Sequence, residues 1–328
     1  MSLVEIWTEL ERSIPGDQLH GRRRIHGDAV ADLNITITQP GPRRGLSLTV
    51  EDAVLVDIDD LPATRGLDHI RRPAGRSGRT ILEIRLTDPT ANEMFIGLAE
   101  DVAGTVSRAH DDREAVGLWL SRIRSWQRLM ASAPTGLSGE RQRGLYAELE
   151  FLRHDLEPLV GITGSVDGWQ GPLGGHDFQL AGGAYEIKGS ASHDPQIVRI
   201  SSERQLDETG TDSLHLVHLS LDVHQHAGES LPELVASVRS LAANTAVEAL
   251  LNERLVDAGY ADAHEPHYRT TGYTIRERQY FRVGDGFPRI IEDDLANGVG
   301  SVRYRLAIAA CAAFSTTPES ALEPLGPR

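Results

Sequence analysis

The chain has 328 residues, 40% hydrophobic and 25% charged, which is ordinary for a soluble globular protein of two domains or one large one. Its single cysteine, Cys311, excludes an internal disulfide framework and a cysteine-based zinc site, and its net charge of −15 argues against a histone-like DNA-binding protein. No apolar run reaches transmembrane length and the first residues lack a secretory signal pattern, so we expect a cytoplasmic protein without a membrane segment.

The first 90 residues are expected to form a small β-rich module. Helical spacing predicts a short opening helix, and strict alternation of apolar with polar residues predicts three strands, at 33–38, 46–50 and 80–86. Arginines gather in the segments between them, which we interpret as turns and loops, at 21–24, 41–45 and 71–79. The sequence leaves open whether these arginines contact phosphate or are solvated turns.

A helical pattern replaces the β pattern from residue 92 to about residue 133. The sequence APTG at 133–136 interrupts it and is the predicted domain boundary. We therefore expect three parts: a β-rich and helical module at 1–135, a second domain at 136–314, and a flexible tail rich in proline and serine at 315–328.

The second domain is predicted to begin with a helix that runs from the N-cap Ser138 to about residue 160. Glu148 falls within or beside the apolar stripe of that helix. A carboxylate there needs a partner, because burying an unpaired charge costs several kcal/mol. A metal or a cation of a functional site would provide one, as would an arginine, and a position at the edge of the stripe would remove the need.

Two short strands joined by a tight turn are predicted next, from GHDF at 175–178 to YEIKGS at 185–190. Alternation along the second strand places Glu186 and Lys188 on one face, and the hairpin brings Asp177 opposite them to within about one residue of register. Two carboxylates and an ammonium that converge on one sheet face indicate a divalent-metal site with a positioned base or electrophile.

Lys188 is the single lysine among the 33 basic residues of the chain. A lysine in a sequence whose other basic residues are all arginine indicates that this position requires a compact ammonium group whose pKa can shift. The same region is acidic, with 14 Asp and Glu against 6 Lys and Arg in residues 138–222. Bound cations invert the local charge of such a site, so the acidity does not argue against phosphate chemistry.

The remaining elements of the second domain follow from their patterns. We predict a strand at 197–200, a short helix from residue 201, a central strand at 214–223, two helices at 231–241 and 245–258, and β structure at 267–283 and 302–312. Arg276 and Arg278, beside Tyr280 and Phe281, are explained equally well as DNA contacts or as ordinary cross-strand pairs.

The order of helix, three strands, short helix and strand, together with Glu148, Asp177 and the Glu186-x-Lys188 pair, resembles the core of the PD-(D/E)XK nuclease superfamily. The resemblance covers about residues 138–223. It implies an α/β fold with a restriction-endonuclease-like core (α-β-β-β-α-β, mixed central sheet), an N-terminal β-rich module and a C-terminal α+β extension. His176 stands where the superfamily name has proline, which is not a catalytic position.

More narrowly, the chain resembles the bacterial PD-(D/E)XK motif proteins encoded in restriction and phage-defence gene clusters. The segments that carry this resemblance are GLYAELEFL at 144–152, WQG at 169–171, HDF at 176–178, EIK at 186–188 and ISSERQL at 200–206. It implies DNA as substrate and, as partners, the helicase-like ATPase and the DNA methyltransferase of the same cluster. A homodimer is left open, because many such nucleases cut both strands as dimers.

The resemblance also implies a role for each site residue. Asp177, Glu186, the Ile187 carbonyl and Glu148 would hold Mg²⁺, with Mn²⁺ as a substitute, and Lys188 would position the attacking water. Gln205 would orient water or phosphate, and the candidate substrate contacts are His176, Ser201, Ser202 and His193. The expected activity is Mg²⁺-dependent DNA cleavage by the endonuclease subunit of a restriction or defence system. The alternative is a non-cleaving DNA-binding or assembly subunit that keeps the nuclease fold.

Overall fold

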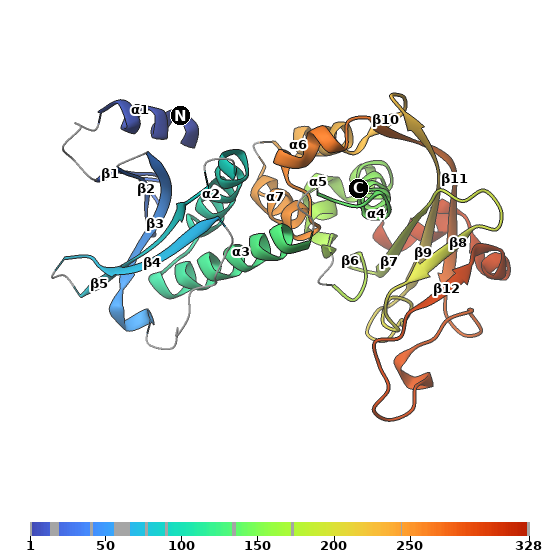
Figure 1. Cartoon of the computed structure of the whole chain (residues 1–328). Helices are drawn as coiled ribbons and strands as arrows, with labels where there is room; N and C mark the ends of the chain where they lie inside the picture. Colours follow the sequence, from blue (N-terminus) through green and yellow to red (C-terminus); the bar gives the residue numbers. More distant parts are fainter. Residues whose placement is uncertain are drawn as a thin grey trace. The chain divides into compact units, whose positions relative to one another are not determined.

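The computed structural model describes residues 2–13, 20–39, 42–55, 66–75, 78–88, 91–132, 136–171, 174–243 and 245–326. The chain forms two units, residues 1–134 with 261–263, and residues 135–260 with 264–328 (Figure 1). Of the boundary predicted at 133–136, only Gly136 lies within the described residues.

The first unit contains a five-stranded antiparallel sheet with the strand order β1-β2-β3-β5-β4. Its strands are β1 (His20–Arg24), β2 (Asp32–Thr38), β3 (Arg43–Glu51), β4 (Leu67–Pro73) and β5 (Arg79–Leu86). The three strands predicted from alternation lie within β2, β3 and β5, and are confirmed. The helices are α1 (Leu3–Ser13), α2 (Asn92–Val106) and α3 (Asp112–Ser132). Trp7 of α1 is fully buried, with its ring centroid 5.6 Å from that of Phe95 in α2.

The arginine-rich segments of this unit are mostly strands rather than turns, which corrects the expectation. Arg22 to Arg24 belong to β1, and Arg71 and Arg72 belong to β4. These two strands are the edges of the sheet. An edge strand tolerates charged side chains, so it lacks the apolar alternation by which the inner strands were recognised. Parts of the predicted loops, at 41 and at 76–77, lie outside the described residues.

The second unit is built on a sheet with the strand order β10-β11-β9-β7-β6, to which β13 is added by pairing with β11. Its strands are β6 (Phe178–Leu180), β7 (Gly183–Ser190), β9 (Leu214–Gln225), β10 (Glu229–Ser230), β11 (Thr271–Val283) and β13 (Ser315–Thr316). β7 and β9 are parallel, and the other pairs are antiparallel. The apolar run at 214–223 therefore forms a central strand, as predicted.

Helices cover one face of this sheet. They are α4 (Gly139–Phe151), α5 (Glu157–Gly168), α6 (Leu231–Ala242) and α7 (Glu248–Asp257) (Figure 1). One apolar cluster joins them to alternate residues of β7, β9 and β11, among them Ile187, Leu219 and Tyr280. A second cluster on the other face joins Leu216 and Phe281 to the short strands β8 (Ile197–Ile200) and β12 (Tyr304–Ala307). Among the described residues, no helix is both long and apolar enough to cross a bilayer.

The third strand of the expected core is present but lies elsewhere. β8 pairs with β12 in a separate two-stranded ribbon, because β6 and β9 already occupy both edges of β7. The predicted short helix after it is a series of turns. Two side chains there accept hydrogen bonds from backbone amides: Gln205 accepts from the Ser201 amide, and Ser202 accepts from the Arg204 amide. Such bonds compete with helix formation. The mixed α/β class is confirmed, and the α-β-β-β-α-β order is not reproduced.

The C-terminal segment is folded through residue 326, in contrast to the flexible tail that we expected. After a 3₁₀ segment at Ile308–Phe314, the chain forms β13 and the helix α8 (Pro318–Leu322). Thr317 caps α8, and Ala321 and Leu322 are buried. The Tyr185 hydroxyl donates a hydrogen bond of 3.0 Å to the Ala321 carbonyl, so the tail is tied to β7. The β structure predicted at 302–312 is limited to β12.

Candidate active site

The hairpin β6–β7 determines where the first carboxylate lies. Its turn is Ala181-Gly182, and Gly182 has φ of 101°, a conformation that favours glycine. Phe178 pairs with Tyr185, so the next position outward places Asp177 beside Glu186. Asp177 Oδ2 accepts a hydrogen bond of 2.7 Å from the backbone amide of Ile187. The register predicted from the sequence is therefore correct.

Glu186 and Lys188 form an ion pair on one face of β7. Lys188 Nζ lies 2.5 Å from Glu186 Oε1. The Glu186 side chain is fully buried, whereas 15% of the Lys188 side chain is exposed. Glu186 Oε2 is buried and has no hydrogen-bond partner among the described residues. Lys188 thus stands at the solvent side of the pair.

Glu148 reaches the hairpin because α4 approaches β7 closely. Gly189 permits this approach, since a Cβ there would lie 2.9 Å from the Arg143 carbonyl and 3.0 Å from the Ala147 Cβ. Glu148 is half-buried, and its Oε2 accepts a hydrogen bond of 2.9 Å from the Trp169 indole. The charges that act on it include those of Asp177, Lys188 and Glu186. Of the partners that the sequence left open, no arginine forms an ion pair with Glu148 among the described residues, and Lys188 is the cation whose charge acts on it.

Gln205 and Ser201 join the site from the turn after β8. Gln205 Oε1 accepts a hydrogen bond of 3.4 Å from Lys188 Nζ and one of 2.7 Å from the Ser201 amide. Lys188 is thus held between a carboxylate and an amide. Ser202 Oγ instead accepts from the Arg204 amide, a contact that supports the turn.

In their ionised forms, the three carboxylates would carry more negative charge than Lys188 alone neutralises. Burial, together with the charge of Asp177, raises the pKa of Glu186 to about 8, although Lys188 opposes the rise. Burial also raises the pKa values of Glu148 and Asp177. Burial lowers the pKa of Lys188, but the charges of Glu186 and Asp177 outweigh it and raise the pKa overall. Lys188 is therefore an ammonium at neutral pH, and a further cation would stabilise the ionised carboxylates.

The two candidate histidines have different surroundings. His176 Nε2 lies 3.0 Å from the Asp207 carbonyl, and burial lowers the pKa of its imidazole. The neutral ring donates to that carbonyl and connects the start of β6 to the segment before β9. His193 lies with Arg276, which also contacts the Ser192 carbonyl and Ser220. The structure does not bring His193 to the carboxylates.

Arg276 and Arg278 are engaged by the fold itself. Arg276 is 3.2 Å from Asp222, and Arg278 is 2.8 Å from Asp155 and also pairs with Glu150. Arg276 thus pairs with the neighbouring strand β9, whereas Arg278 pairs with α4 and the helical turn that follows it, and both sets of contacts favour structural ion pairs over DNA binding.

Two side chains at or near the site are not among the site residues that the sequence predicts. Trp169 belongs to the WQG segment, and its indole donates a hydrogen bond to Glu148. His218 is fully buried on β9, in register with Lys188, and lies 2.8 Å from Ser190 Oγ and 2.9 Å from Gln279 Oε1. Its signal in the sequence was a histidine inside an otherwise apolar central strand.

The donor atoms fit a hard divalent cation. Glu186 Oε2 is a buried oxygen without a partner in the described part of the chain, and Mg²⁺ prefers carboxylate and carbonyl oxygens. Asp177, Glu186, Glu148 and the Ile187 carbonyl are the groups that would hold it. In the described residues, no three His, Cys, Asp or Glu side chains are already gathered in metal-binding geometry, so ion binding would have to draw the carboxylates together.

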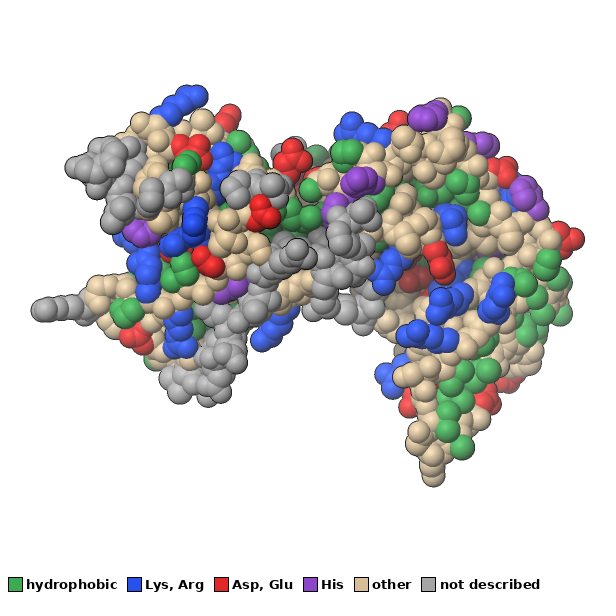
Figure 2. Space-filling view, viewed as in Figure 1, with side chains coloured by type: hydrophobic (Ala, Val, Ile, Leu, Met, Phe, Trp, Pro, Cys, Tyr) green, Lys and Arg blue, Asp and Glu red, His purple; other side chains and the backbone are tan. Residues whose placement is uncertain are grey.

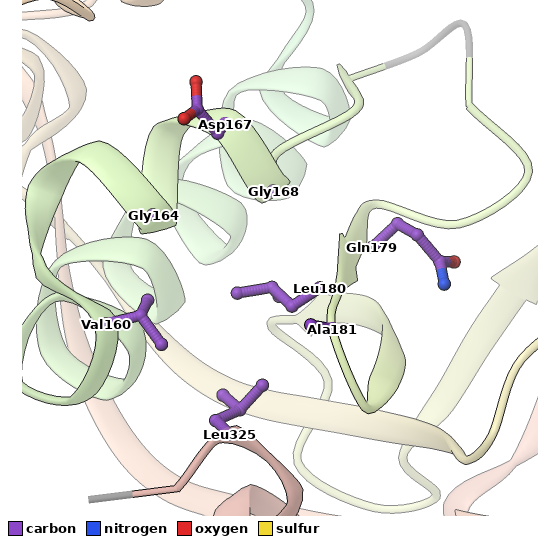
Figure 3. A pocket seen from close by; sticks show the side chains of 8 residues that line it. All are labelled: Val160, Gly164, Asp167, Gly168, Gln179, Leu180, Ala181 and Leu325. Carbon is purple, nitrogen blue, oxygen red and sulfur yellow. The ribbon is translucent and has the colours of Figure 1, made fainter. Parts of the chain in front are cut away.

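A cavity of about 340 Å³ lies apart from this site, between α5 and the β6–β7 turn (Figure 3). Val160, Leu180 and Leu325 point into it, and most of its lining is aliphatic or backbone. None of the predicted catalytic residues lines it, so it does not contribute to the chemistry of the carboxylates.

Comparison with known proteins agrees with the geometry of the site. Curated proteins and solved structures give no match. Residues 3–309 match one family, DUF4420, which is described as "Putative PD-(D/E)XK family member". The match contains Glu148, the hairpin with Asp177, Glu186 and Lys188, and the turn with Gln205. Because it covers nearly the whole chain, the protein belongs to DUF4420, and the resemblance to PD-(D/E)XK proteins seen in the sequence is confirmed.

Proposed function

We propose that this protein is a Mg²⁺-dependent DNA endonuclease that hydrolyses phosphodiester bonds. The observation that carries the proposal is the convergence of Asp177, Glu186 and Glu148 on Lys188, the single lysine of the chain. Structural ion pairs alone would not require the buried, unpartnered oxygen of Glu186. Membership in a PD-(D/E)XK family supports the same chemistry.

Each residue of the site has a distinct task in this proposal. When bound, Mg²⁺ would lower the pKa of a water molecule and neutralise charge on the scissile phosphate. Lys188 donates hydrogen bonds to the attacking oxygen and holds it in line with the phosphorus. Gln205 and Glu186 fix the position of the Lys188 ammonium. Trp169 orients the Glu148 carboxylate, and the Ile187 amide orients that of Asp177.

We further propose that the protein works as the nuclease subunit of a restriction or phage-defence system. Its partners would be a helicase-like ATPase and a DNA methyltransferase encoded beside it. The resemblance to motif proteins of such gene clusters supports this context. The acidic character of residues 138–222 is consistent with it, because a partner would supply part of the affinity for DNA.

The test is a DNA cleavage assay in Mg²⁺, with and without the products of the neighbouring genes and ATP. Asp177→Asn and Lys188→Met should each lower the cleavage rate by about 100-fold or more. Glu148→Gln should also impair cleavage, and Glu140→Gln, at an exposed position of the same helix, is the matched control. Wild-type cleavage by either Asp177→Asn or Lys188→Met would refute the assignment.

A metal-binding measurement distinguishes a nuclease from a non-cleaving protein that keeps the same fold. Ca²⁺ or Mn²⁺ should raise the melting temperature of the wild-type protein, because a ligand that binds only the folded state stabilises it. Asp177→Asn should abolish that shift. An equal shift in both proteins would show that the ion binds elsewhere.

A further inference from the structure

The β8–β12 ribbon has one apolar face and one basic face. Val198, Ile200 and Leu306 point inward and belong to the second apolar cluster. Alternation turns the other side chains outward, and Arg199 and Arg305 are exposed there. Arg303, two residues before Arg305, is exposed as well. On the face shown in Figure 2, Lys and Arg side chains gather over the part of the second unit that contains β8 and β12 in Figure 1.

Arg199 and Arg305 lie directly opposite each other, because they are paired in the register of the ribbon. Like charges at directly opposed positions destabilise an antiparallel pair. Within the described residues, no carboxylate forms an ion pair with Arg199, Arg303 or Arg305. The nearby Glu203 carboxylate accepts hydrogen bonds from the Ser301 and Val302 amides instead. The fold therefore leaves three uncompensated positive charges together in a chain of net charge −15.

The ribbon leads directly into the candidate active site. β8 ends at Ile200, and the next residue, Ser201, donates its amide to Gln205, which contacts Lys188. Arg199 lies two residues before Ser201, which is roughly 7 Å along an extended chain. Phosphates on one DNA strand follow each other at about 3.4 Å along the helix axis. A strand whose scissile phosphate lies at Lys188 would thus pass the arginines within a few nucleotides.

We infer that Arg199, Arg303 and Arg305 form a phosphate-binding strip that holds the DNA backbone beside the carboxylate site. This inference rests on the proposed function and adds the surface by which the substrate is held. Guanidinium groups suit the role because their donors match phosphate oxygens in a bidentate geometry. The like-charge pair on the ribbon is relieved when a phosphate lies between its members.

The test is equilibrium binding of the full-length protein to a fluorescent 20-base-pair DNA duplex, with Ca²⁺ in place of Mg²⁺ and at several salt concentrations. Arg199→Ala combined with Arg305→Ala should weaken binding by about 10-fold and lower the slope of log K against log salt by about 1–2, as expected for the loss of one or two phosphate contacts. Arg282→Ala is the matched control, since Arg282 is also an exposed strand arginine but lies on the helix-covered face of the sheet, two residues from Tyr280.

A second variant distinguishes the loss of DNA contacts from a loss of folding stability. Arg199→Glu should convert the repulsive pair into an attractive one, so it should raise the melting temperature without DNA and weaken DNA binding more than Arg199→Ala does. Unchanged affinity and salt slope in the double alanine variant, or an equal loss in Arg282→Ala, would overturn the strip while leaving the proposed nuclease intact. Failure of the wild-type protein to bind the duplex would overturn the strip, whereas absence of cleavage with the neighbouring gene products and ATP present would overturn the proposed nuclease.

Discussion

At Glu186 the structure departs from what stability alone would select. Its carboxyl is fully buried, one oxygen contacts Lys188, and the other oxygen has no partner among the described residues. Leaving a buried acceptor unpaired costs about 1–3 kcal/mol. The cation of the proposed function would use the unpaired oxygen and so offset that cost.

The raised pKa of Glu186 predicts how the metal-free protein responds to pH. Burial raises that pKa to about 8 from its ordinary value of 4.5, so the folded state retains a proton that the unfolded state has released. The stability that this group contributes is present in full below pH 4.5 and is lost as the pH rises through 8. Melting temperatures in a chelator should therefore fall over that window, and Glu186→Gln should flatten the fall.

Glu233 provides the control of opposite sign. Its pKa is lowered by hydrogen bonds from the Ser230 amide and hydroxyl at the start of α6. Its contribution is present above its ordinary pKa and lost as the pH falls through the lowered value. Glu233→Gln should therefore leave the decline toward pH 8 unchanged. If Glu186→Gln shows the same decline as the wild-type protein, then Glu186 is not the group that titrates.

Trp169 is predicted to act on the metal through Glu148. Trp169→Phe removes the indole that donates to Glu148 Oε2 and leaves that carboxylate free to rotate. The concentration of Mg²⁺ needed for half-maximal cleavage should rise by about 10-fold or more, as for other groups that orient metal ligands. Trp126→Phe tests the specificity of the effect, because the Trp126 indole also donates to a carboxylate, Asp101, but in the other unit. An equal rise in both variants would contradict the role.

The site residues that could be predicted are those that local sequence determines. A two-residue turn fixes the register of Asp177 against Glu186 and Lys188, so their proximity follows from about ten residues of sequence. The contacts of Trp169 with Glu148 and of His218 with Gln279 join separate elements, and no spacing rule gives them. His193 follows the same strand as Lys188, yet it contacts Arg276, which lies on β11 and is far from it in the sequence.

At the scale of elements, the packing of α4 against β7 decides whether Glu148 can serve the site. Gly189→Ala would place a Cβ 2.9 Å from the Arg143 carbonyl and force α4 away from β7. We expect a loss of about 1–3 kcal/mol in the free energy of unfolding, as for other overpacked positions, together with a loss of cleavage. Urea denaturation and the cleavage assay measure the two effects.

Gly144→Ala is the matched change on the same helix. Nothing lies within 4 Å of a Cβ at Gly144, which is inside α4. Replacing a helical glycine by alanine should stabilise the protein by about 0.5–1 kcal/mol. A Gly189→Ala protein as stable and active as Gly144→Ala would show that α4 has room to move and that its close approach does not position Glu148.

The elements that were predicted wrongly share a physical cause. β1 and β4 are edge strands whose charged residues conceal the alternation, and the turn at 201–206 is stabilised by side chains that compete with a helix. β8 has the right pattern for a strand but pairs with β12, about one hundred residues later in the chain. Periodicity identifies an element, whereas its neighbours are decided by which edges other strands have already occupied.

At the scale of the whole molecule, each of the two units has buried residues of its own. Leu48 on β3 belongs to the first unit and Leu219 on β9 to the second, and both are fully buried. The carboxylates, Lys188 and the basic ribbon all belong to the second unit. Metal and DNA should therefore stabilise the second unit directly, and the first unit only as far as the two units unfold together.

Calorimetry of the full chain tests this division. We expect two unfolding transitions, and Ca²⁺ at about 100 times its dissociation constant should stabilise one of them by about 2.7 kcal/mol. Leu219→Ala should lower that same transition and Leu48→Ala the other, since each change removes a buried side chain at a cost of about 2–5 kcal/mol. A single transition that shifts as a whole with Ca²⁺ and with both variants would show that the two units unfold as one. A Ca²⁺ shift confined to the transition that Leu48→Ala lowers would place the metal outside the unit that contains Asp177 and Glu186.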